Sequence, residues 1–377
     1  MLTQPHTQVA IWQDNPTPIV TPLLQPDNGC VQLVVFYESH LDCRHIKAFC
    51  DARNIDFIAH PIAERQLPLE QLNDLPVRFI NLTQGNIAQK DQLLSWGRTR
   101  DIPAYWVDHE TDMYSLVSPD KHAPVAIVDR LNIKQFLELK GFSVTGLTRQ
   151  TPDFNEWVEV ANTWVRHLAM YEKGFRALNH LARTANEKTH VTEPLSLGLQ
   201  NNQHLKRIIG DLQQAALITK KDKRLVFKNA EAKQFCHGIW LEYYAYGQLK
   251  KLAKQRSDIQ DIAMSVNVQR GDPQNPIRNE IDVIALINNR LYIVECKTGV
   301  LDAKQSQLAL YRLDTIADLF GPLTQGALLS FDAISPLIKR RAKEIDIRIV
   351  DYRNMTQLSR VINDLAERYA TPEPEAL

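Results

Sequence analysis

The sequence predicts an α/β protein built from three parts, and three observations carry this prediction. Strand-length apolar runs alternate with helix-compatible segments over residues 8–140, which is the spacing of a doubly wound parallel sheet. From about residue 150 the apolar residues recur at helical spacing instead. Beyond residue 231 a long helix leads into three closely spaced strands. We therefore expect domains at residues 1–145, 146–230 and 231–377.

Strands and helices follow one another in order through the first part. Its clearest helices are "DCRHIKAFCDARN" (42–54) and "QKDQLLSWGRTR" (89–100), and "NIKQFLELKGF" (132–142) predicts an exit helix that ends at Gly141. The runs at 113–119 and 123–129 would add a closing pair of strands. The predicted strands of the parallel sheet are 8–12, 31–37, 54–62, 77–82 and 102–108.

The middle part predicts helices followed by a short two-stranded flap. Apolar residues lie at helical spacing over residues 154–184 and again over 201–221. The basic turn "KKDKR" (220–224) and the strand "RLVF" (224–227) come next. Two helices and a flap of strands are the order of a winged-helix module, so we expect a small, helical, winged-helix-like module here.

The last part predicts an α/β core with the element order αβββαβ, which is the order of nuclease-like cores. Its first helix is "EAKQFCHGIWLEYYAYGQLKKLA", and its three strands are "IAMSVNVQ", "EIDVIALI" and "RLYIVEC". The helix "QSQLALYRLDTIADLF" and the apolar runs "GALLSF" and "IDIRIVD" complete it.

The stretch "EIDVIALINNRLYIVECKTG" (280–299) places charges in the most strand-like segment of the chain. Its Asn-Asn pair (288–289) predicts a two-residue hairpin turn, because asparagine tolerates the positive φ angles of a type I′ turn. Counting outward from this turn, Asp282 lies opposite Glu295. Cross-strand partners have Cβ atoms about 4.5–5.5 Å apart, where like charges are destabilising. Strand alternation brings Lys297 to the face of Glu295.

A divalent cation would relieve the repulsion between the two acids, because Mg²⁺ and Mn²⁺ prefer hard oxygen ligands. Asp282 and Glu295 are therefore the predicted ligands of Mn²⁺ or Mg²⁺. Lys297 can orient or deprotonate a water and neutralise charge on a phosphorane, so the cluster fits metal-assisted phosphodiester hydrolysis. Glu242, on the preceding helix, is a further candidate for the metal shell. The alternative is an ion-pair ladder on a solvated strand face, but "LYIV" is too apolar for a solvated edge.

Composition argues against several other classes of protein. Lys and Arg number 44, as do Asp and Glu, so the chain is not a polycation built for non-specific nucleic-acid coating. The five cysteines form no C-x-x-C pair, which argues against a zinc ribbon or a disulfide framework. No apolar run approaches the roughly 18 residues of a membrane span. The start of the chain lacks a signal-peptide pattern, so we expect a cytoplasmic protein with no membrane partner.

The chain resembles a known family of nucleases over nearly its whole length, and most strongly in residues 238–350. The hairpin looks like the core of restriction-endonuclease-like (PD-(D/E)xK) nucleases. The wider frame resembles more closely the CARF-domain nucleases of type III CRISPR systems, although "LFGP" (319–322) departs from the two glycines usual there. The resemblance is carried by "GIWLEYY", "RNEIDVIALINNRLYIVECKTG", "LYRLDTIADLFG" and "ALLSF…RRAKEIDIRIVD".

The resemblance implies a Rossmann-like CARF sheet in the first part and a restriction-endonuclease-like core in the last. In that family a cyclic oligoadenylate switches on a metal-dependent nuclease within a homodimer. By the motif match, Asp282, Glu295 and Lys297 inherit the metal-binding and catalytic roles, and Glu242 inherits that of the helix acid. The expected substrate is DNA or RNA, with single strands preferred.

The first part would bind the activator at its switch point. If the strand order is 3-2-1-4-5, ligands bind beyond the carboxyl ends of the first and fourth strands. The loop "NLTQGN" after the fourth strand resembles the ligand loop of CARF domains; Ile87 stands where a cation is common, and Lys90 would substitute for it. A ring ligand with rotational symmetry also predicts a two-fold homodimer. The predicted ligand-binding residues are Asp14, Asn15, Thr17, Asn81, Thr83, Gln84 and Gly85.

The leading hypothesis is thus a metal-dependent endonuclease activated by cyclic oligoadenylate, with cyclic tetra-adenylate the favoured ring. The alternative is a ligand-responsive transcription regulator, in which "NNQHLKRIIGDL" would be the recognition helix and "KKDKR" the wing. A regulator has no use for the acids paired across the hairpin. A third possibility is a ring nuclease that only degrades the signal. Such an enzyme would need a histidine or paired acids in the predicted ligand loops, which are "QDNPTP" (13–18) and "NLTQGN" (81–86), and neither loop has them.

Overall fold

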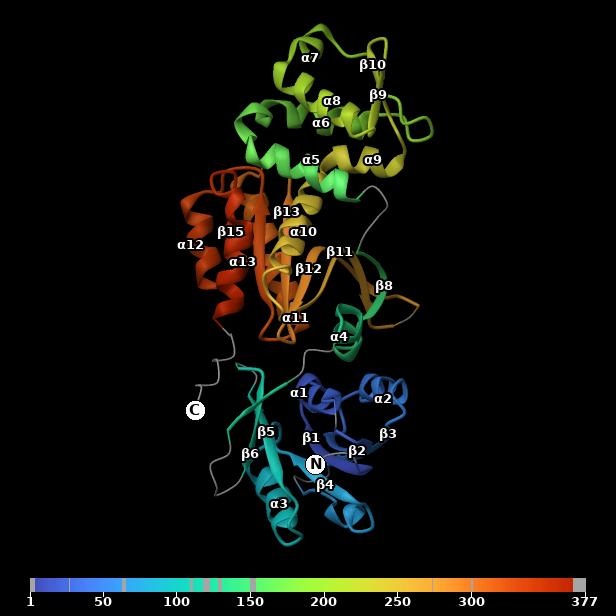
Figure 1. Ribbon diagram of the computed structural model, residues 1–377, viewed down its shortest axis with the longest axis vertical. Helices are drawn as coiled ribbons and strands as arrows, with labels where there is room; N and C mark the ends of the chain where they lie inside the picture. Colours follow the sequence, from blue (N-terminus) through green and yellow to red (C-terminus); the bar gives the residue numbers. More distant parts are fainter. Residues whose placement is uncertain are drawn as a thin grey trace.

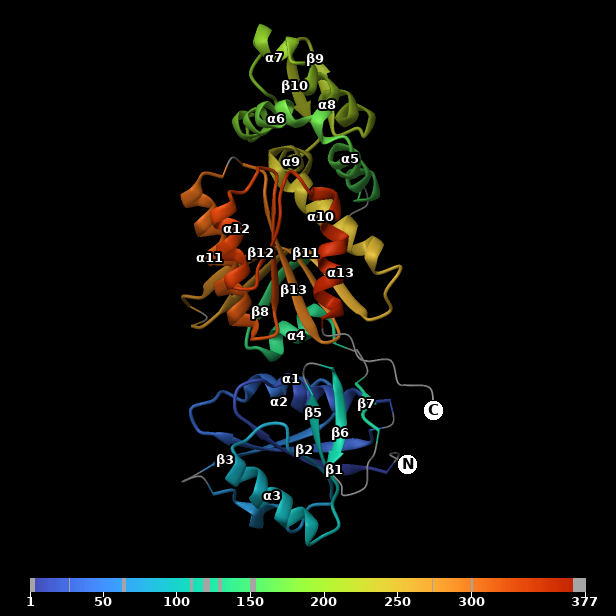
Figure 2. The same ribbon diagram turned by 90° about the vertical axis from the view of Figure 1, so that its left-hand side faces the viewer.

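The three parts of the molecule lie along one long axis, but not in chain order. The computed structural model describes residues 4–26, 28–62, 66–108, 111–117, 123–127, 131–149, 154–272, 274–299 and 301–368. Figures 1 and 2 show the last part of the chain at the centre, with the first part at one end and the middle part at the other. The predicted fold class, an α/β chain with a parallel first sheet and a second α/β core, is confirmed.

The first part is a seven-stranded sheet with the order β3-β2-β1-β4-β5-β6-β7. Its five parallel strands have the predicted order 3-2-1-4-5, and β6 and β7 add an antiparallel edge. Residues 118, 119, 128 and 129 of the two predicted closing runs lie outside the described residues. The elements are β1 (His6–Trp12), α1 (Thr17–Val20), β2 (Cys30–Glu38), α2 (Arg44–Asp51), β3 (Asp56–Ile62), β4 (Val77–Asn81), α3 (Ile87–Arg98), β5 (Ala104–Asp108), β6 (Met113–Val117) and β7 (Val125–Ala126).

The middle part is a helical module with a two-stranded wing. The predicted helical segment 154–184 forms two helices, because the break lets Tyr171 and Phe175 pack against Trp164, with ring centroids 6.4 Å and 5.2 Å away. The elements are α5 (Phe154–Arg166), α6 (Glu172–Thr184), α7 (Leu197–Asn201), α8 (Gln203–Gln214), β9 (Ile218–Lys221) and β10 (Arg224–Phe227).

The last part is a six-stranded sheet with the order β15-β14-β13-β12-β11-β8 and helices on both faces. The predicted 231–253 helix is interrupted by a π-helical turn, Phe235–Ile239, where Gly238 has a φ angle of 144°. The elements are α9 (Ala230–Gln234), α10 (Trp240–Leu252), β11 (Ile259–Arg270), β12 (Ile277–Ile287), β13 (Arg290–Lys297), α11 (Ala303–Phe320), β14 (Gln325–Ser330), α12 (Pro336–Glu344), β15 (Arg348–Val350) and α13 (Leu358–Glu367).

The linker after the first sheet belongs physically to the last part. It forms α4 (Ile133–Leu139) and β8 (Ser143–Thr148), and β8 pairs antiparallel with β11 as the edge strand of the nuclease-like sheet. The predicted boundary at residue 145 therefore cuts through a strand. Long-range pairing of this kind leaves no local pattern in the sequence, since a six-residue strand with Gly146 in it is a weak signal.

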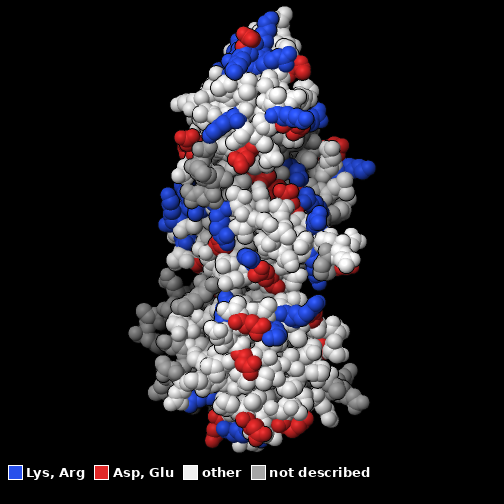
Figure 3. Space-filling model, turned by 90° about the vertical axis from the view of Figure 1, so that its right-hand side faces the viewer, with Lys and Arg blue, Asp and Glu red and all other residues white. Residues whose placement is uncertain are grey.

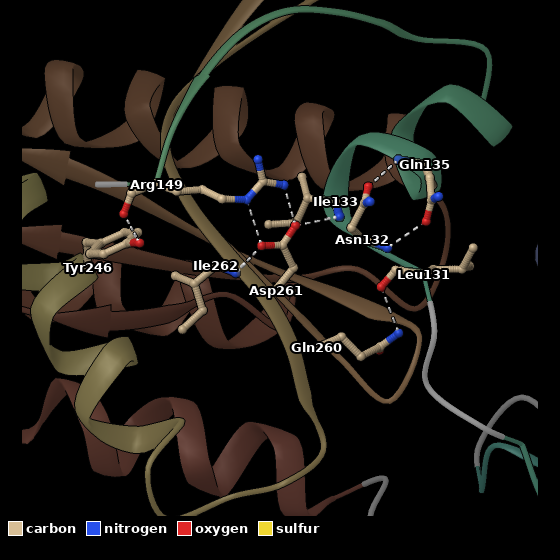
Figure 4. A network of polar contacts seen from close by, with 9 residues as sticks. All are labelled: Leu131, Asn132, Ile133, Gln135, Arg149, Tyr246, Gln260, Asp261 and Ile262. Carbon is tan, nitrogen blue, oxygen red and sulfur yellow. Dashed lines mark hydrogen bonds and ion pairs between the residues drawn. The ribbon is translucent and has the colours of Figure 1, made fainter. Parts of the chain in front are cut away.

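A network centred on Asp261 of β11 fastens this linker (Figure 4). The Asp261 carboxylate accepts hydrogen bonds from Arg149 (2.7 Å to NH2) and from the backbone N–H of Ile133 at the start of α4 (3.0 Å). The Tyr246 hydroxyl of α10 donates to the Arg149 carbonyl oxygen. Gln260 donates to the Leu131 carbonyl oxygen at 3.2 Å. One carboxylate thus joins the helix start, the linker and the central sheet.

Two apolar clusters join the central sheet to its neighbours. On one face Ile284 and Leu291 lie in a cluster that continues through α4 to Ile19 and Ile46 of the first part. On the other face a second cluster continues into the middle module, where Phe175 stacks on Trp240 at 4.6 Å between ring centroids. Neighbouring parts of the molecule therefore share hydrophobic cores, so they are held together by packing and not only by connecting segments.

The hairpin turn of β12 and β13 rests on the first part. Asn288 and Asn289 have φ angles of 46° and 53°, as a type I′ turn requires. The pairs Ile287–Arg290 and Leu286–Leu291 follow the predicted register. The side-chain amide of Asn289 donates to the Asp112 carboxylate of the first part at 2.9 Å, and both residues are buried. The turn is thus part of the interface between the two sheets.

We expect Asp261→Ala to lower the free energy of unfolding of the central part by roughly 1–3 kcal/mol, because it leaves the buried Ile133 N–H without an acceptor and Arg149 without its ion pair. The midpoint of urea unfolding checks this. Glu159→Ala is the control, since its ion pair with Arg166 is solvent-exposed and contributes roughly 0–1 kcal/mol. Equal shifts for the two variants would contradict a central role for Asp261.

Candidate nuclease site

The candidate site forms where two neighbouring strands stop pairing with each other. β12 and β13 pair from the turn as far as Val283 and Val294. Beyond that point β12 continues its pairing with β11, and β13 continues with β14 as far as Lys297 and Ser330. The strands therefore diverge directly after the last apolar pair. Asp282 and Glu295 are the first residues past this point, one on each strand.

The structure brings together all four predicted catalytic residues. Glu242 lies in the first turn of α10, and its carboxylate accepts a hydrogen bond from Ser265 Oγ of β11 at 3.2 Å. Asp282 accepts one from the backbone N–H of Cys296 at 2.7 Å. Glu295 is almost fully buried, with 3% of its surface exposed. Lys297 Nζ lies 2.5 Å from the Glu295 carboxylate.

Two of the carboxyl groups lack a full set of counter-charges. Burial and the nearby charge of Asp282 raise the pKa of Glu242 to about 9. Burial and the charge of Glu295 raise the pKa of Asp282 to about 6. Desolvation and like charge both favour the neutral acid, so the raised pKa values report crowded negative charge. Perturbed carboxyls that share a cavity are typical of functional sites.

Glu295, in contrast, is neutralised by two cations. Besides Lys297, Arg312 of α11 approaches its carboxylate at 3.1 Å and also donates to the Glu280 carbonyl oxygen at 3.1 Å. Burial alone would lower the pKa of Lys297, but the charge and hydrogen bond of Glu295 outweigh it and raise the pKa. Lys297 is therefore an ammonium that stabilises negative charge in this arrangement. Arg312 and Ser265 were not predicted, because no pattern in the sequence places their elements beside the hairpin.

A cavity of about 660 Å³ gives access to this cluster. Glu242, Asp282 and Lys297 form one side of it. The lining also includes Glu231 and Gln234 of α9, and His237 and Gly238 of the π-helical turn. A cavity of this size, with acids and a lysine on one wall, can admit a phosphodiester group.

The donor set fits a hard divalent cation. Asp282 and Glu242 offer carboxylate oxygens in the same cavity, and their raised pKa values mark uncompensated charge that a cation would relieve. In the described part of the chain, no three His, Cys, Asp or Glu side chains stand together as a preformed metal site. Two carboxylates with waters and a substrate oxygen are the usual set for Mg²⁺.

The predicted ligand residues of the first part meet at its switch point. The Gln84 side chain of the loop after β4 accepts from the backbone N–H groups of Gln13 (2.8 Å) and Asp14 (3.2 Å), and donates to the Asn15 carbonyl oxygen. Asn81 donates to the Pro18 carbonyl oxygen at 2.8 Å. Both amides are buried, so they hold the two loops together.

The remaining predicted ligand residues lie in or beside the same two loops. Thr83 donates to Asn81 and accepts from the Val107 N–H, and the Thr17 side chain is buried. Gly85 has a φ angle of 101°, and a Cβ there would lie 2.9 Å from Ile11, so the tight packing of this loop requires glycine. Lys90 donates to the Thr83 carbonyl oxygen at 3.2 Å.

Sequence reasoning missed one cation at the switch point. Lys140, after α4, donates to the Asn15 side chain at 2.6 Å, and burial lowers its pKa to about 8. It comes from 125 residues further along the chain. Only the packing of α4 against the first sheet reveals it.

The wing of the middle module carries the basic residues that the sequence indicated. Lys220, Lys221 and Lys223 are exposed on and beside β9 and β10. Figure 3 shows Lys and Arg side chains gathered at this end of the molecule. The predicted recognition helix, α8, buries Leu205 and Leu212 against the module core.

Known proteins are similar to this chain in the sequence of its last part and in the fold of its whole length. Residues 229–369 match the family of Card1-like endonuclease domains. The fold of the whole chain is similar to protein VC1899 from Vibrio cholerae, with a TM-score of 0.86, 23% identity, and coverage of 97% of this chain and 99% of that one. No curated protein matches the sequence.

Two further solved structures share the fold. Can2 from Sulfobacillus thermosulfidooxidans, solved with cyclic tetra-adenylate, has a TM-score of 0.74 and 19% identity over 96% of this chain and 99% of that one. A type III CRISPR defence DNA nuclease activated by cyclic oligoadenylate has a TM-score of 0.52 and 15% identity over 88% of this chain and 46% of that one. The match of residues 229–369 to Card1-like endonuclease domains confirms the predicted resemblance to CARF-domain nucleases, and the solved structures show a shared fold. No helix among the described residues is both long and apolar enough to span a membrane.

We expect the metal-free protein to lose stability as the pH rises. Glu242 has an ordinary pKa of 4.5 and a raised pKa of about 9 in the folded state. The folded protein therefore holds a proton that the unfolded chain has released, and stability falls between these two pH values. In EDTA at pH 8, Glu242→Gln should melt above the wild type, by roughly 2–4 °C per kcal/mol of relieved repulsion.

At pH 4.5 the melting temperatures of Glu242→Gln and wild type should lie much closer together, because both then carry a neutral group that can accept from Ser265. Glu344→Gln, at an exposed position on α12, is the control and should change little at either pH. A stabilisation of Glu242→Gln that is independent of pH would refute the proposed charge crowding.

Proposed function

We propose that this chain is a metal-dependent endonuclease that a cyclic oligoadenylate switches on in type III CRISPR defence. The observation that carries the proposal is the cluster of Asp282, Glu295 and Lys297 at the divergence of β12 and β13. It lies inside the segment that matches the Card1-like endonuclease domain. A buried carboxylate cluster beside a cavity is a costly arrangement, and hydrolysis of phosphodiester bonds explains it.

Each residue of the cluster has its own proposed role in the hydrolysis. Asp282 and Glu295 would hold Mn²⁺ or Mg²⁺, and Glu242 would complete the shell, directly or through a water. The metal, when bound, polarises the phosphodiester and lowers the pKa of a bound water. Lys297, kept as an ammonium by Glu295, orients water and stabilises charge that develops on the phosphoryl oxygens. Arg312 holds the Glu295 carboxylate in place from α11.

Contacts between the first part and the catalytic hairpin support activation by a ligand at the switch point. Lys140 joins the switch-point loop, through Asn15, to the end of α4. The Asp112–Asn289 hydrogen bond joins the first part to the turn of the hairpin that carries Asp282 and Glu295. A ligand that binds one arrangement of these contacts better than another shifts the population of site geometries.

The nature of the activator and the assembly follow from the same reasoning. Can2, which shares the fold, was solved with cyclic tetra-adenylate, and we propose the same ring here. A ring with rotational symmetry presents equal faces to two switch points, so a two-fold homodimer fits. Single-stranded DNA or RNA is the proposed substrate.

We expect the full chain, with Mn²⁺ and cyclic tetra-adenylate, to cut single-stranded DNA or RNA. Glu295→Ala should lower the rate by about 10²-fold or more, because it removes a metal ligand and the partner of Lys297. Gel electrophoresis of end-labelled strands measures the rate. Lys304→Ala, at an exposed position on α11, is the control and should cut like the wild type. Equal cutting by Glu295→Ala would refute the site.

We expect Gln84→Ala to weaken activator binding by about tenfold or more, since it removes three hydrogen bonds that join the two switch-point loops. Calorimetric titration with cyclic tetra-adenylate measures the affinity. Gln71→Ala, at an exposed position outside the loops, should bind like the wild type. An affinity unchanged in Gln84→Ala would show that the ring binds elsewhere.

A further inference from the structure

One wall of the nuclease cavity is built by a segment that belongs to no predicted site. Glu231, Gln234 and His237 are exposed and stand three residues apart, so they share one side of the helical segment. That side lines the same cavity as Asp282 and Lys297. Helix α9 and the π-helical turn, which follow the middle module in the chain, therefore help to line the site.

A rare backbone conformation positions this side of the cavity. Residues 235–239 form a π-helical turn, a rare conformation that frequently occurs at functional sites. Gly238 has a φ angle of 144°, and a Cβ there would lie 2.5 Å from Thr298 Oγ1. Only glycine lets the turn approach the residue that follows Lys297. The position of His237 is thereby set relative to the catalytic strand.

The turn is held from behind by packing and hydrogen bonding. Phe235 and Cys236 are fully buried, and the Phe235 ring lies 5.2 Å from that of Trp157. The Asn179 side chain of α6 lies 2.9 Å from the His237 carbonyl oxygen and 3.1 Å from that of Cys236, where its amide nitrogen donates to both. Among the described residues no hydrogen bond engages the His237 ring. Its backbone is therefore fixed while its side chain is available to a ligand.

The charges of the cavity show what this side chain could bind. The opposite wall carries the carboxyl groups of Glu242, Glu280 and Asp282, which repel a phosphate. Among the exposed residues of the lining, His237 and Gln234 carry side-chain groups that can donate to a phosphate oxygen. The donors of Lys297, Thr298, Thr148, Ser265, Tyr243 and Trp157 belong to less exposed residues. Glu231 lies one turn before Gln234, and its carboxylate also repels a phosphate. The region that can bind a phosphate is therefore limited to the part of the lining near β13.

We propose that His237, together with Gln234, binds a backbone phosphate of the single-stranded nucleic-acid substrate beside the bond that is cut. This inference rests on the proposed nuclease function. Helix α9 and the π-helical turn are then part of the substrate-binding surface, and the nucleic-acid strand enters between this turn and the divergent ends of β12 and β13.

Steady-state cleavage of single-stranded DNA by the full chain, with Mn²⁺ and cyclic tetra-adenylate, tests the proposal. His237→Ala should raise KM by roughly 10–100-fold, the effect of losing a hydrogen bond to a charged group, with a smaller change in kcat. His237→Asn, which keeps a donor, should recover part of the affinity. Gln234→Ala should raise KM by a smaller factor. His180→Ala, at an exposed position on α6, is the matched control and should leave KM unchanged.

A purely structural role predicts a different pattern. Loss of packing would lower the melting temperature of His237→Ala, and asparagine would not restore the affinity. An unchanged KM in His237→Ala, with an active wild type, would overturn the proposal and leave the nuclease function intact. A wild type that cuts no nucleic acid would instead remove the proposed function itself.

Discussion

The structure depends on one constraint: β12 and β13 must pair tightly at one end and separate at the other. Pairing from the Asn288–Asn289 turn to Val283 and Val294 fixes the register. Separation beyond that point gives each acid its own neighbouring strand, β11 or β14, for backbone pairing. The carboxylates can then sit inside a sheet without leaving backbone groups unpaired.

The acids at the open end are compensated unequally. Glu295 has two cations within 3.1 Å, whereas Glu242 and Asp282 share a cavity and have raised pKa values. Negative charge is therefore neutralised at Glu295 by Lys297 and Arg312, and stays uncompensated at Glu242 and Asp282. Buried like charges destabilise the folded state by themselves, so the arrangement is best understood as strain retained for chemistry.

Sequence reasoning predicted the elements whose signals are local. The Asn-Asn turn and the alternation of β12 and β13 sufficed to place Asp282 beside Glu295, because both depend on neighbours in the chain. The spacing of the first part predicted a parallel sheet, and the strand order 3-2-1-4-5 that we assumed for it is the one observed. The approximate positions of the seven ligand residues followed from that order.

What sequence reasoning missed lies in contacts between distant segments. Arg312 reaches Glu295 from α11, and Lys140 reaches Asn15 across 125 residues. Strand β8 was not predicted, because an edge strand is defined by the strand with which it pairs. The π-helical turn was not predicted either, because a single glycine in a helical pattern does not reveal its φ angle. Helices α12 and α13 were not predicted, because the neighbouring apolar runs "GALLSF" and "IDIRIVD" indicate strands.

The position of β8 has a practical consequence for dividing the chain into fragments. The endonuclease-family match begins at residue 229, yet the edge of the catalytic sheet is completed by residues 143–148. A fragment cut at the family boundary would leave β11 with a row of free backbone donors and acceptors, which invites strand addition from other molecules and aggregation. The smallest folding unit that contains the β12–β13 hairpin therefore begins before α4, and it includes the entire middle module.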